Sequence, residues 1–360
     1  MNNPQPVTTP PSGRLTTLVF DWGDTLMLND LTQSGPMARW PKVSAVAGAA
    51  EALAQLKGRY HLAVATNAAD SRSRDVRAAL ARVGLDSFFE AIFTSGELGS
   101  RKPDPAFFQS MQSVLGIEPS QAVMIGDDYR VDVLGAHAAG WTTLWYHPAG
   151  RSSPGLLPLQ DAEITHLDQL PALLDRRMVP GYSTCLTWLL EQALPHNLLG
   201  HVHAVAAAAY QMAVWLQAAG SDVDPLLTHR GALLHDLAKL KGMELHTSHA
   251  ELAARMLKDR GEPVLAECAR RHALFAILQP ENAPRTWEEK LVYFADKLVE
   301  GSKLAGLDER MDSLRQRYPD DAEKIAAMGP ALYHFQDEIC SALGIRTNDL
   351  VKRLKSAYRE

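Results

Sequence analysis

The sequence is poor in three features that would each mark a particular class of protein. Its three cysteines, Cys185, Cys268 and Cys340, lie far apart, are odd in number and form no CxxC pair. This pattern argues against a disulfide-stapled scaffold and predicts reduced thiols in a cytoplasmic protein. No apolar run approaches the about 20 residues that cross a bilayer, so we expect no membrane partner. The net charge of −6 gives no global basic footprint for nucleic acid.

What the sequence does contain changes character about halfway along. The first half alternates short apolar runs, typical of buried strands, with amphipathic stretches of helical period. We expect strands at 15–20, 61–65, 91–93, 122–125, 142–145 and 163–165, and helices at 45–57, 71–83, 106–115, 131–139 and 167–174. This alternation predicts an α/β fold with a doubly wound parallel sheet, whose ligands gather at the carboxyl ends of the strands. The second half has Ala/Leu-rich segments of helical period and predicts an all-α domain.

These patterns divide the chain into four segments. We expect a flexible tail at 1–13, an α/β domain at 14–176, a linker at 177–182 and a helical domain at 183–360. The tail is rich in Pro, Thr and Asn and has no apolar core of a signal peptide. Pro180 and Gly181 mark the linker.

The helical half carries further signals of where its helices begin and end. Capping boxes predict helix starts at Ser248-x-x-Glu251 and Thr286-x-x-Glu289, and we expect the second helix to run to Glu300. We expect His201 to open a long helix. After Gly301 we expect helices at 308–317, 321–328 and 332–343, which form a packing or dimerisation appendage and make a homodimer possible.

The first cluster of polar residues follows the apolar strands of the α/β half. It consists of residues that come directly after a strand or in a short loop: Asp21, Gly23, Asp24, Thr66, Asn67, Lys102, Asp127 and Asp132. A carboxylate nucleophile, a hydroxyl, a lysine and a metal-binding acid suit phosphoryl transfer, because a metal and a lysine neutralise charge on the phosphoryl oxygens.

The order of these residues resembles the haloacid dehalogenase superfamily over roughly residues 14–176. The resemblance implies a phosphatase that forms an aspartyl-phosphate on Asp21 and uses Mg²⁺. It implies that Thr66 binds the phosphoryl group and that Lys102 matches the third motif. Asp127 and Asp132 match the acids of the fourth motif. We therefore predict that the substrate is bound by Thr66, Asn67 and Lys102. We predict that the metal is bound by Asp21, Asp127, Asp132 and the Gly23 carbonyl.

The first motif departs from the phosphatase pattern at Gly23. Phosphatases of this superfamily carry there an Asp that acts as general acid and base, whereas this chain has Asp24 one place later. Three explanations stay open: Asp24 substitutes as a catalytic residue, a good leaving group needs no acid, or the site is weak. Asp21 and Thr66 are too close in sequence for a large helical cap, so we expect a capless, open site whose specificity lies in the loop 27–43.

The second cluster is a set of histidines on helices. Eight of the thirteen histidines fall between His196 and His272, and His235-Asp236 interrupts an apolar stretch. Burying these groups costs several kcal/mol unless they are paired or bound to metal. Asp296 lies within another apolar stripe. Such a His/Asp set suits a divalent metal that activates water.

This pattern resembles the HD-domain metal-dependent phosphohydrolases over roughly residues 196–304. The resemblance implies a metal held by His201, His235, Asp236 and Asp296. It implies a second metal at His249 and His272, with the doublet Asp bridging the two. We expect one or two divalent ions, Mn²⁺, Fe or another. Lys239 and Lys297 are candidate phosphate-binding residues, and His203, His229 and His246 are bystanders.

Three functions remain open from the sequence. The first is a bifunctional phosphohydrolase that acts on small phosphorylated substrates, nucleotides among them. In this case the helical half cleaves a nucleotide, phosphodiester or phosphoanhydride, and nucleic-acid ends are a weaker substrate class. The second is a single HD phosphohydrolase regulated by a degenerate phosphate-binding HAD module. The third is an interaction scaffold without metal.

Overall fold

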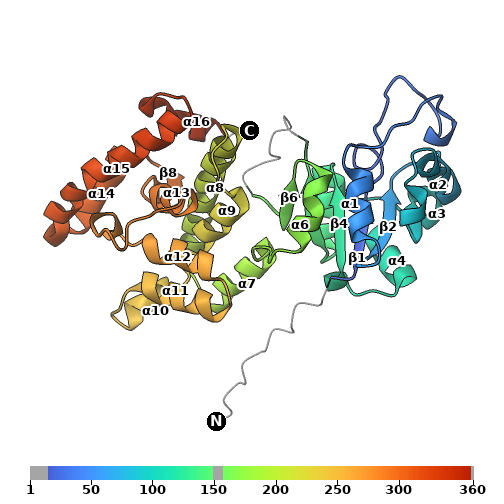
Figure 1. Ribbon diagram of the computed structural model, residues 1–360. Helices are drawn as coiled ribbons and strands as arrows, with labels where there is room; N and C mark the ends of the chain where they lie inside the picture. The colour runs from blue at the N-terminus through green and yellow to red at the C-terminus, as the bar shows by residue number, and fades with distance from the viewer. Residues whose placement is uncertain (1–14, 149–156, 358–360) are drawn as a thin grey trace, which may run out of the picture. The chain divides into compact units, whose positions relative to one another are not determined.

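The computed structural model describes residues 15–148 and 157–357, which form two compact units (Figure 1). The first unit contains residues 15–148 and Leu159–Met178, and the second contains 157–158 and the described residues from Val179 onward. The division between Met178 and Val179 lies inside the segment that we expected as a linker. No described helix is both long and apolar enough to cross a membrane.

The first unit is built on a six-stranded sheet in which every strand runs parallel to its neighbours. The strand order is β3-β2-β1-β4-β5-β6, so β1 and β4 lie side by side in the centre. The strands are β1 (Thr17–Phe20), β2 (His61–Thr66), β3 (Ala91–Thr94), β4 (Ala122–Gly126), β5 (Thr142–Tyr146) and β6 (Ala162–Ile164). The doubly wound parallel sheet that the sequence predicts is therefore confirmed.

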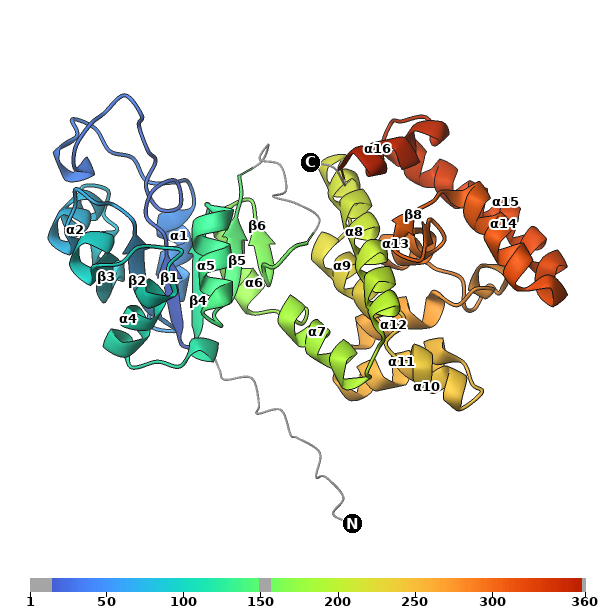
Figure 2. The same cartoon turned by 180° about the vertical axis from the view of Figure 1, so that it is seen from behind.

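Helices cover both faces of this sheet. Figures 1 and 2 show α1 and α6 on one face and α4 and α5 on the other, and two separate apolar cores fill the two interfaces. Alternate residues of one strand supply both cores: Leu18 and Phe20 pack on one face and Val19 on the other. The helices are α1 (Ala49–Leu56), α2 (Ser73–Ala81), α3 (Ser95–Leu98), α4 (Pro105–Leu115), α5 (Leu134–Ala138) and α6 (Leu170–Leu174). Short 3₁₀ turns lie at Met37–Arg39, Asp86–Phe88, Pro119–Gln121 and Leu167–Gln169.

Two predicted helices of this unit start elsewhere than expected. The helix α1 begins four residues later than predicted, because Gly48 precedes it at a φ of +81°. The predicted helix at 131–139 begins earlier, as a π-helical turn at Tyr129–Val133 that leads into α5. This wider turn carries the buried Asp132, and such turns are often found at functional sites.

The second unit is helical apart from one short hairpin, β7 (Val299–Glu300) and β8 (Lys303–Leu304), within its described residues. Its core is continuous, and α8 packs along α9 and α13. The first helices are α7 (Tyr182–Glu191), α8 (His196–Ala218), α9 (Pro225–Leu234), α10 (Lys239–Glu244), α11 (His249–Asp259) and α12 (Pro263–Arg271). The remaining helices are α13 (Trp287–Asp296), α14 (Leu307–Arg317), α15 (Ala322–Ala342) and α16 (Leu350–Ala357), with 3₁₀ turns at Ala276–Leu278, Pro319–Asp321 and Thr347–Asp349.

Four expectations about these helices need correction. The helix α8 begins at His196, so His201 lies in its second turn and does not open it. The helix α13 ends at Asp296, because the chain enters β7 by Val299. The two helices predicted at 321–328 and 332–343 are one helix, α15, which continues through the exposed Pro330.

The last correction concerns the capping boxes. The box of Thr286 and Glu289 is complete. At α11, Ser248 accepts from Glu251 N, but no return bond from Ser248 N to Glu251 is present among the described residues.

Candidate functional sites

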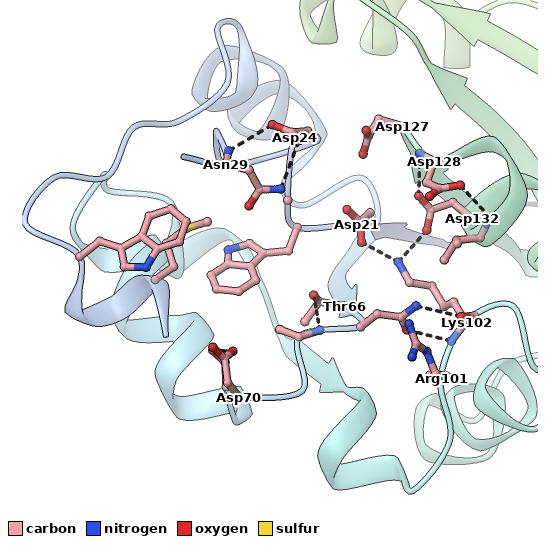
Figure 3. Close-up of a pocket in the computed structure, with 18 of the residues that line it drawn as sticks. Asp21, Asp24, Asn29, Thr66, Asp70, Arg101, Lys102, Asp127, Asp128 and Asp132 are labelled. Carbon is pink, nitrogen blue, oxygen red and sulfur yellow. Dashed lines mark hydrogen bonds and ion pairs between the residues drawn. The ribbon is translucent and has the colours of Figure 1, made fainter. Parts of the chain in front are cut away.

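The first candidate site lies at the carboxyl ends of β1, β2 and β4, where the predicted acids converge (Figure 3). Asp21, Asp127 and Asp132 each place a carboxylate oxygen within 4.8 Å of the others. Gly126 makes this approach possible, because a Cβ there would lie 2.2 Å from Asp132 Oδ2. Three carboxylates this close repel one another unless a cation lies among them, and oxygen ligands of this kind suit Mg²⁺.

Lys102 supplies one of the cations that hold these acids together. Its Nζ donates to Asp21 Oδ1 and Asp132 Oδ1, both at 2.6 Å, and to the Ala65 carbonyl at 2.8 Å. Burial lowers the pKa of Lys102, but Asp132 and Asp21 outweigh it, so the net shift is upward and the ammonium stays charged. Burial raises the pKa of Asp132 to about 7 against the opposing effect of Lys102. The lysine therefore places the Asp21 carboxylate beside the remaining acids.

Thr66 and Asn67 follow β2 and line the same cavity, but they make different contacts. Thr66 Oγ1 accepts from Ala68 N at 3.1 Å, which leaves its hydroxyl hydrogen for another acceptor. The Asn67 side chain forms two hydrogen bonds with the backbone of Lys102. Its Nδ2 donates to the Lys102 carbonyl at 2.8 Å, and its Oδ1 accepts from the Lys102 N–H at 2.9 Å. Asn67 thus fixes the loop that carries the lysine.

Asp24 lies apart from the three acids. Its backbone has a φ of +56°. Its Oδ1 accepts a hydrogen bond from the Asn29 backbone N–H and its Oδ2 accepts one from Asn29 Nδ2, both at 3.1 Å. Figure 3 shows Asp24 and Asn29 facing one another above Asp21. Asp127 instead accepts from Thr25 Oγ1 at 3.0 Å. Gly23 lines the cavity between these two arrangements.

The cavity over this site holds about 500 Å³ and has walls that the motifs did not indicate. The loop 27–43, which we expected to determine specificity, contributes several lining residues. The lining residues outside the predicted set are Trp22, Asn29, Gly35, Met37, Trp40, Ala68, Asp70, Ser71, Arg101, Asp128 and Val131. Arg82, directly after α2, holds that loop by donating to the carbonyls of Ala38, Trp40 and Pro41. The length of the loop 27–43 is the only feature of the sequence that could have indicated that it lines the cavity.

The second candidate site gathers the predicted histidines and aspartates from α8, α11 and α13 and from the residues that directly follow α9 and α12. His201 lies on α8, His235 and Asp236 follow α9, and Asp296 ends α13. His201 Nε2 lies 3.0 Å from Asp296 Oδ1, and His235 Nε2 lies 3.7 Å from the same oxygen. His201, His235 and Asp236 form a group whose ligand atoms lie within 4.8 Å of one another.

A second ligand group shares the same aspartate. His249 begins α11 and His272 follows α12, and their Nε2 atoms lie 3.1 Å apart. Asp236 Oδ1 lies 3.1 Å from His249 Nε2 and 3.3 Å from His272 Nε2. Asp236 is therefore common to two groups of potential ligands, each of which contains two histidines.

The orientation of the imidazoles indicates that a cation belongs here. The Nδ1 atoms of His201, His235 and His272 face the backbone carbonyls of Gly301, Ala232 and Ala269, which accept a hydrogen. With the proton on Nδ1, a neutral ring presents a bare lone pair at Nε2. His235 Nε2 is buried and has no hydrogen-bond partner among the described residues. Lone pairs facing carboxylate oxygens fit a divalent metal.

The protonation tendencies of His235, His249 and Asp236 agree with the geometry. Burial lowers the pKa of His235 to about 3, so this ring is neutral and able to bind metal. Burial also lowers the pKa of His249. Although burial opposes it, His235 and the other nearby histidines hold the pKa of Asp236 well below its usual range. Asp236 is thus ionised.

The two lysines near this group differ in exposure. Lys297 is buried and donates to Asp296 Oδ2 at 2.5 Å and to the His272 carbonyl at 3.2 Å, so it fixes parts of both ligand groups. Lys239 is one third exposed, and its Nζ lies 3.3 Å from Asp236 Oδ1. His203 faces Tyr182 at 3.0 Å, and His229 is buried beside Arg230. Neither belongs to a ligand group.

Comparison with known proteins gives both units a family. Residues 27–146 match the haloacid dehalogenase-like hydrolase family, and residues 198–328 match the HD domain. The chain therefore joins a haloacid dehalogenase-like hydrolase domain and an HD domain, as the two motif sets predict.

Individual relatives resemble the first unit. Mouse N-acylneuraminate-9-phosphatase is 32% identical over 123 residues, which cover 34% of this chain and 48% of that protein. Ribulose-1,5-bisphosphate 5-phosphatase of Halopiger xanaduensis is 34% identical over 131 residues, covering 36% and 52%. An uncharacterized protein from Listeria monocytogenes serotype 4b has a crystal structure similar at a TM-score of 0.41 and 27% identity, covering 44% of this chain and 97% of that one. The chain spans about half the length of the curated relatives it matches.

Proposed function

We propose that this chain is a bifunctional phosphohydrolase with one metal-dependent site in each unit. The observation that supports it most is the presence of two separate metal-binding arrangements, one of carboxylates and one of histidines around a shared aspartate. The relatives of the first unit include enzymes named as phosphatases, which supports the same chemistry there.

In the first unit we assign the nucleophile to Asp21. Its Oδ1 is fixed by Lys102 at 2.6 Å, and the Thr66 hydroxyl lines the same cavity and can donate to a phosphoryl oxygen. Asp21, Asp127, Asp132 and the Gly23 carbonyl would hold Mg²⁺, which when bound neutralises charge on the transferred group. Lys102 adds a second positive charge. We assign Asn67 to positioning Lys102, because its amide is bonded to that residue's backbone.

A trapping experiment tests this site. With Mg²⁺, we expect p-nitrophenyl phosphate to be hydrolysed and a beryllium or aluminium fluoride analogue to bind, and we expect both to be lost in Asp21→Asn. Turnover that is unchanged in Asp21→Asn, or no turnover with any phosphorylated donor, would exclude this assignment. That result would favour a regulatory phosphate-binding module beside one active HD site.

In the second unit we assign one metal to His201, His235, Asp236 and Asp296, and a second to His249, His272 and the shared Asp236. These metals, Mn²⁺ or Fe among the candidates, would supply a water of lowered pKa and Lewis acidity. Lys239 is exposed enough to contact a phosphate beside them. We assign Lys297 to positioning Asp296 and not to substrate, because its side chain is buried.

A substrate panel tests the second site. Nucleotides, dinucleoside polyphosphates, cyclic phosphates and sugar phosphates are assayed with Mn²⁺, Fe²⁺ and Mg²⁺. We expect turnover of a nucleotide, diester or anhydride that disappears in Asp236→Ala. Purified protein that contains no metal and binds no added Mn²⁺ or Fe²⁺ would argue instead for the scaffold.

A further inference from the structure

In the first motif of the α/β unit, the Asn29 side chain occupies the space that a side chain at Gly23 would need. A Cβ on Gly23 would lie 2.6 Å from Asn29 Nδ2 and 3.2 Å from Asn29 Oδ1. Asn29 is held in this place because its backbone N and Nδ2 both donate to Asp24. Gly23, Asp24 and Asn29 therefore form one unit that lines the cavity, and Figure 3 shows its Asp24–Asn29 pair.

This unit engages Asp24, the acid that directly follows Gly23 in the first motif. Both carboxylate oxygens of Asp24 accept hydrogen bonds from Asn29, so the carboxylate is turned toward that residue. The positive φ of Asp24 accompanies this orientation of its side chain. Asn29 can donate a hydrogen bond into the cavity that it lines, but an amide does not give up a proton as an acid does.

Other titratable groups that line the cavity are engaged in hydrogen bonds or ion pairs. Lys102 donates to three acceptors, two of them the carboxylates of Asp21 and Asp132. Asp128 accepts from two backbone N–H groups at the start of the π-helical turn. Asp127 accepts from Thr25 and belongs to the acid cluster.

Asp70 is the remaining acid. It is exposed, accepts from Ser71 Oγ at 3.0 Å, and lies apart from Asp21 in Figure 3. Asp127 and Asp132 lie beside Asp21 but belong to the proposed metal ligands, and outside that cluster we find no acid beside Asp21 among the described lining residues.

The chemistry of phosphoryl transfer makes this arrangement selective. When an Asp21 oxygen bonds to phosphorus, the bond from phosphorus to the leaving oxygen breaks, and its electron pair goes to that oxygen. An alkoxide needs a proton at this moment, and a positioned general acid typically contributes about 10²–10⁴ in rate. A carboxylate, a phosphate or a phenolate departs as a stable anion and needs none.

We propose that the HAD site is selective for phosphoryl donors whose leaving group departs as a stable anion, acyl phosphates and phosphoanhydrides above all, and that it discriminates against alkyl phosphates. This inference rests on the phosphoryl transfer to Asp21 proposed above. In the second half-reaction water attacks phosphorus, the bond to Asp21 breaks and returns its electron pair to the carboxylate, and inorganic phosphate leaves. The proton of the water passes to solvent.

The test is a leaving-group series on the full chain with Mg²⁺, with Asp21→Asn as the blank. The donors are acetyl phosphate, pyrophosphate, substituted phenyl phosphates and ethyl phosphate. We expect kcat/KM to fall steeply as the leaving group becomes more basic, by at least about 10² from phenyl to ethyl phosphate, which is the lower end of what an acid supplies. Ethyl phosphate turnover within tenfold of phenyl phosphate would overturn the proposal.

A designed acid provides the second arm. In Gly23→Asp with Asn29→Ala, the space beside Gly23 is vacated and a carboxyl is added. We expect the ratio of ethyl phosphate to acetyl phosphate turnover to rise about 10²-fold, and Asn29→Ala alone to show no such rise. Selective loss of ethyl phosphate turnover in Asp24→Asn or Asp70→Asn would identify that residue as the acid and overturn the proposal. No Asp21-dependent turnover of any donor would instead overturn the proposed function itself.

Discussion

At the scale of single residues, the first unit depends on one buried lysine between two carboxylates. Lys102 is 1% exposed and contacts Asp21 and Asp132 at 2.6 Å. In Lys102→Met these acids lose their cation, and a buried charge without its partner costs about 3–5 kcal/mol. We expect calorimetry to show a lower Tm for the first unit and phenyl phosphate turnover to be lost. Lys57→Met, at an exposed site, is the control and should change neither. An unchanged Tm in Lys102→Met would show that the pair does not form.

The second unit depends at this scale on an aspartate shared by two ligand groups. We expect the full chain reconstituted with Mn²⁺ to bind two ions, His249→Ala to bind one and Asp236→Ala to bind none, because only Asp236 belongs to both groups. Mass spectrometry of the bound metal gives the count. His203→Ala is the matched control, since His203 contacts Tyr182 instead of the site. Full metal content in His249→Ala would contradict the second group.

The sequence predicts these site residues better than it predicts their partners. The order of the motifs predicts that Asp21, Lys102, Asp127 and Asp132 lie together. The reason is that the carboxyl ends of parallel strands meet at one edge of the sheet. The pairing of Asp24 with Asn29 was not predictable in the same way. It depends on a positive φ at Asp24, which is uncommon for a residue other than glycine, and on the path of a loop without a motif.

At the scale of elements, the two capping boxes allow a direct comparison. Thr286 and Glu289 make both reciprocal bonds, whereas Ser248 makes one. Both cap residues are exposed, so their loss removes hydrogen bonds with little packing. We expect Thr286→Ala to cost about 1 kcal/mol of unfolding free energy and Ser248→Ala about half of that. Urea unfolding followed by circular dichroism measures both, and a larger loss in Ser248→Ala would contradict the difference.

The helix α15 is a second case where an element departs from its sequence signals. Pro330 predicts a break, yet the helix runs from Ala322 to Ala342. Proline in a helix interior is about 3 kcal/mol less favourable than alanine. Its rigidity lowers the conformational entropy of the unfolded chain, which offsets about 0.4–1 kcal/mol of this loss. We therefore expect Pro330→Ala to raise the stability of the second unit by about 2 kcal/mol. Pro319→Ala, at the first position of a 3₁₀ turn, should bring no gain. A loss in Pro330→Ala would show that the helix bends there by design.

These elements also show why prediction succeeds and where it ends. Strands such as Leu62–Ala65 are continuous apolar runs, because both faces of a parallel sheet are buried. Helix ends are decided by contacts that no local pattern contains. Packing on the helical core carries α15 past its proline, and the backbone at Gly48 delays the start of α1.

At the scale of the whole molecule, the two proposed sites differ in kind. The potential metal ligands of the first unit are carboxylates, whereas those of the second unit are histidines around Asp236. Among the described residues, no potential ligand group combines residues of both units. The two activities should therefore be lost separately.

The measurement that tests this claim most directly is a crossed assay of two variants on two substrates. Wild type, Asp21→Asn and Asp236→Ala are each assayed with phenyl phosphate and Mg²⁺, and with the best substrate of the nucleotide and diester panel and Mn²⁺. We predict that Asp21→Asn loses the first turnover and keeps the second, and that Asp236→Ala does the reverse. Loss of both turnovers in Asp236→Ala, with neither changed in Asp21→Asn, would contradict two independent hydrolytic sites and leave one HD enzyme.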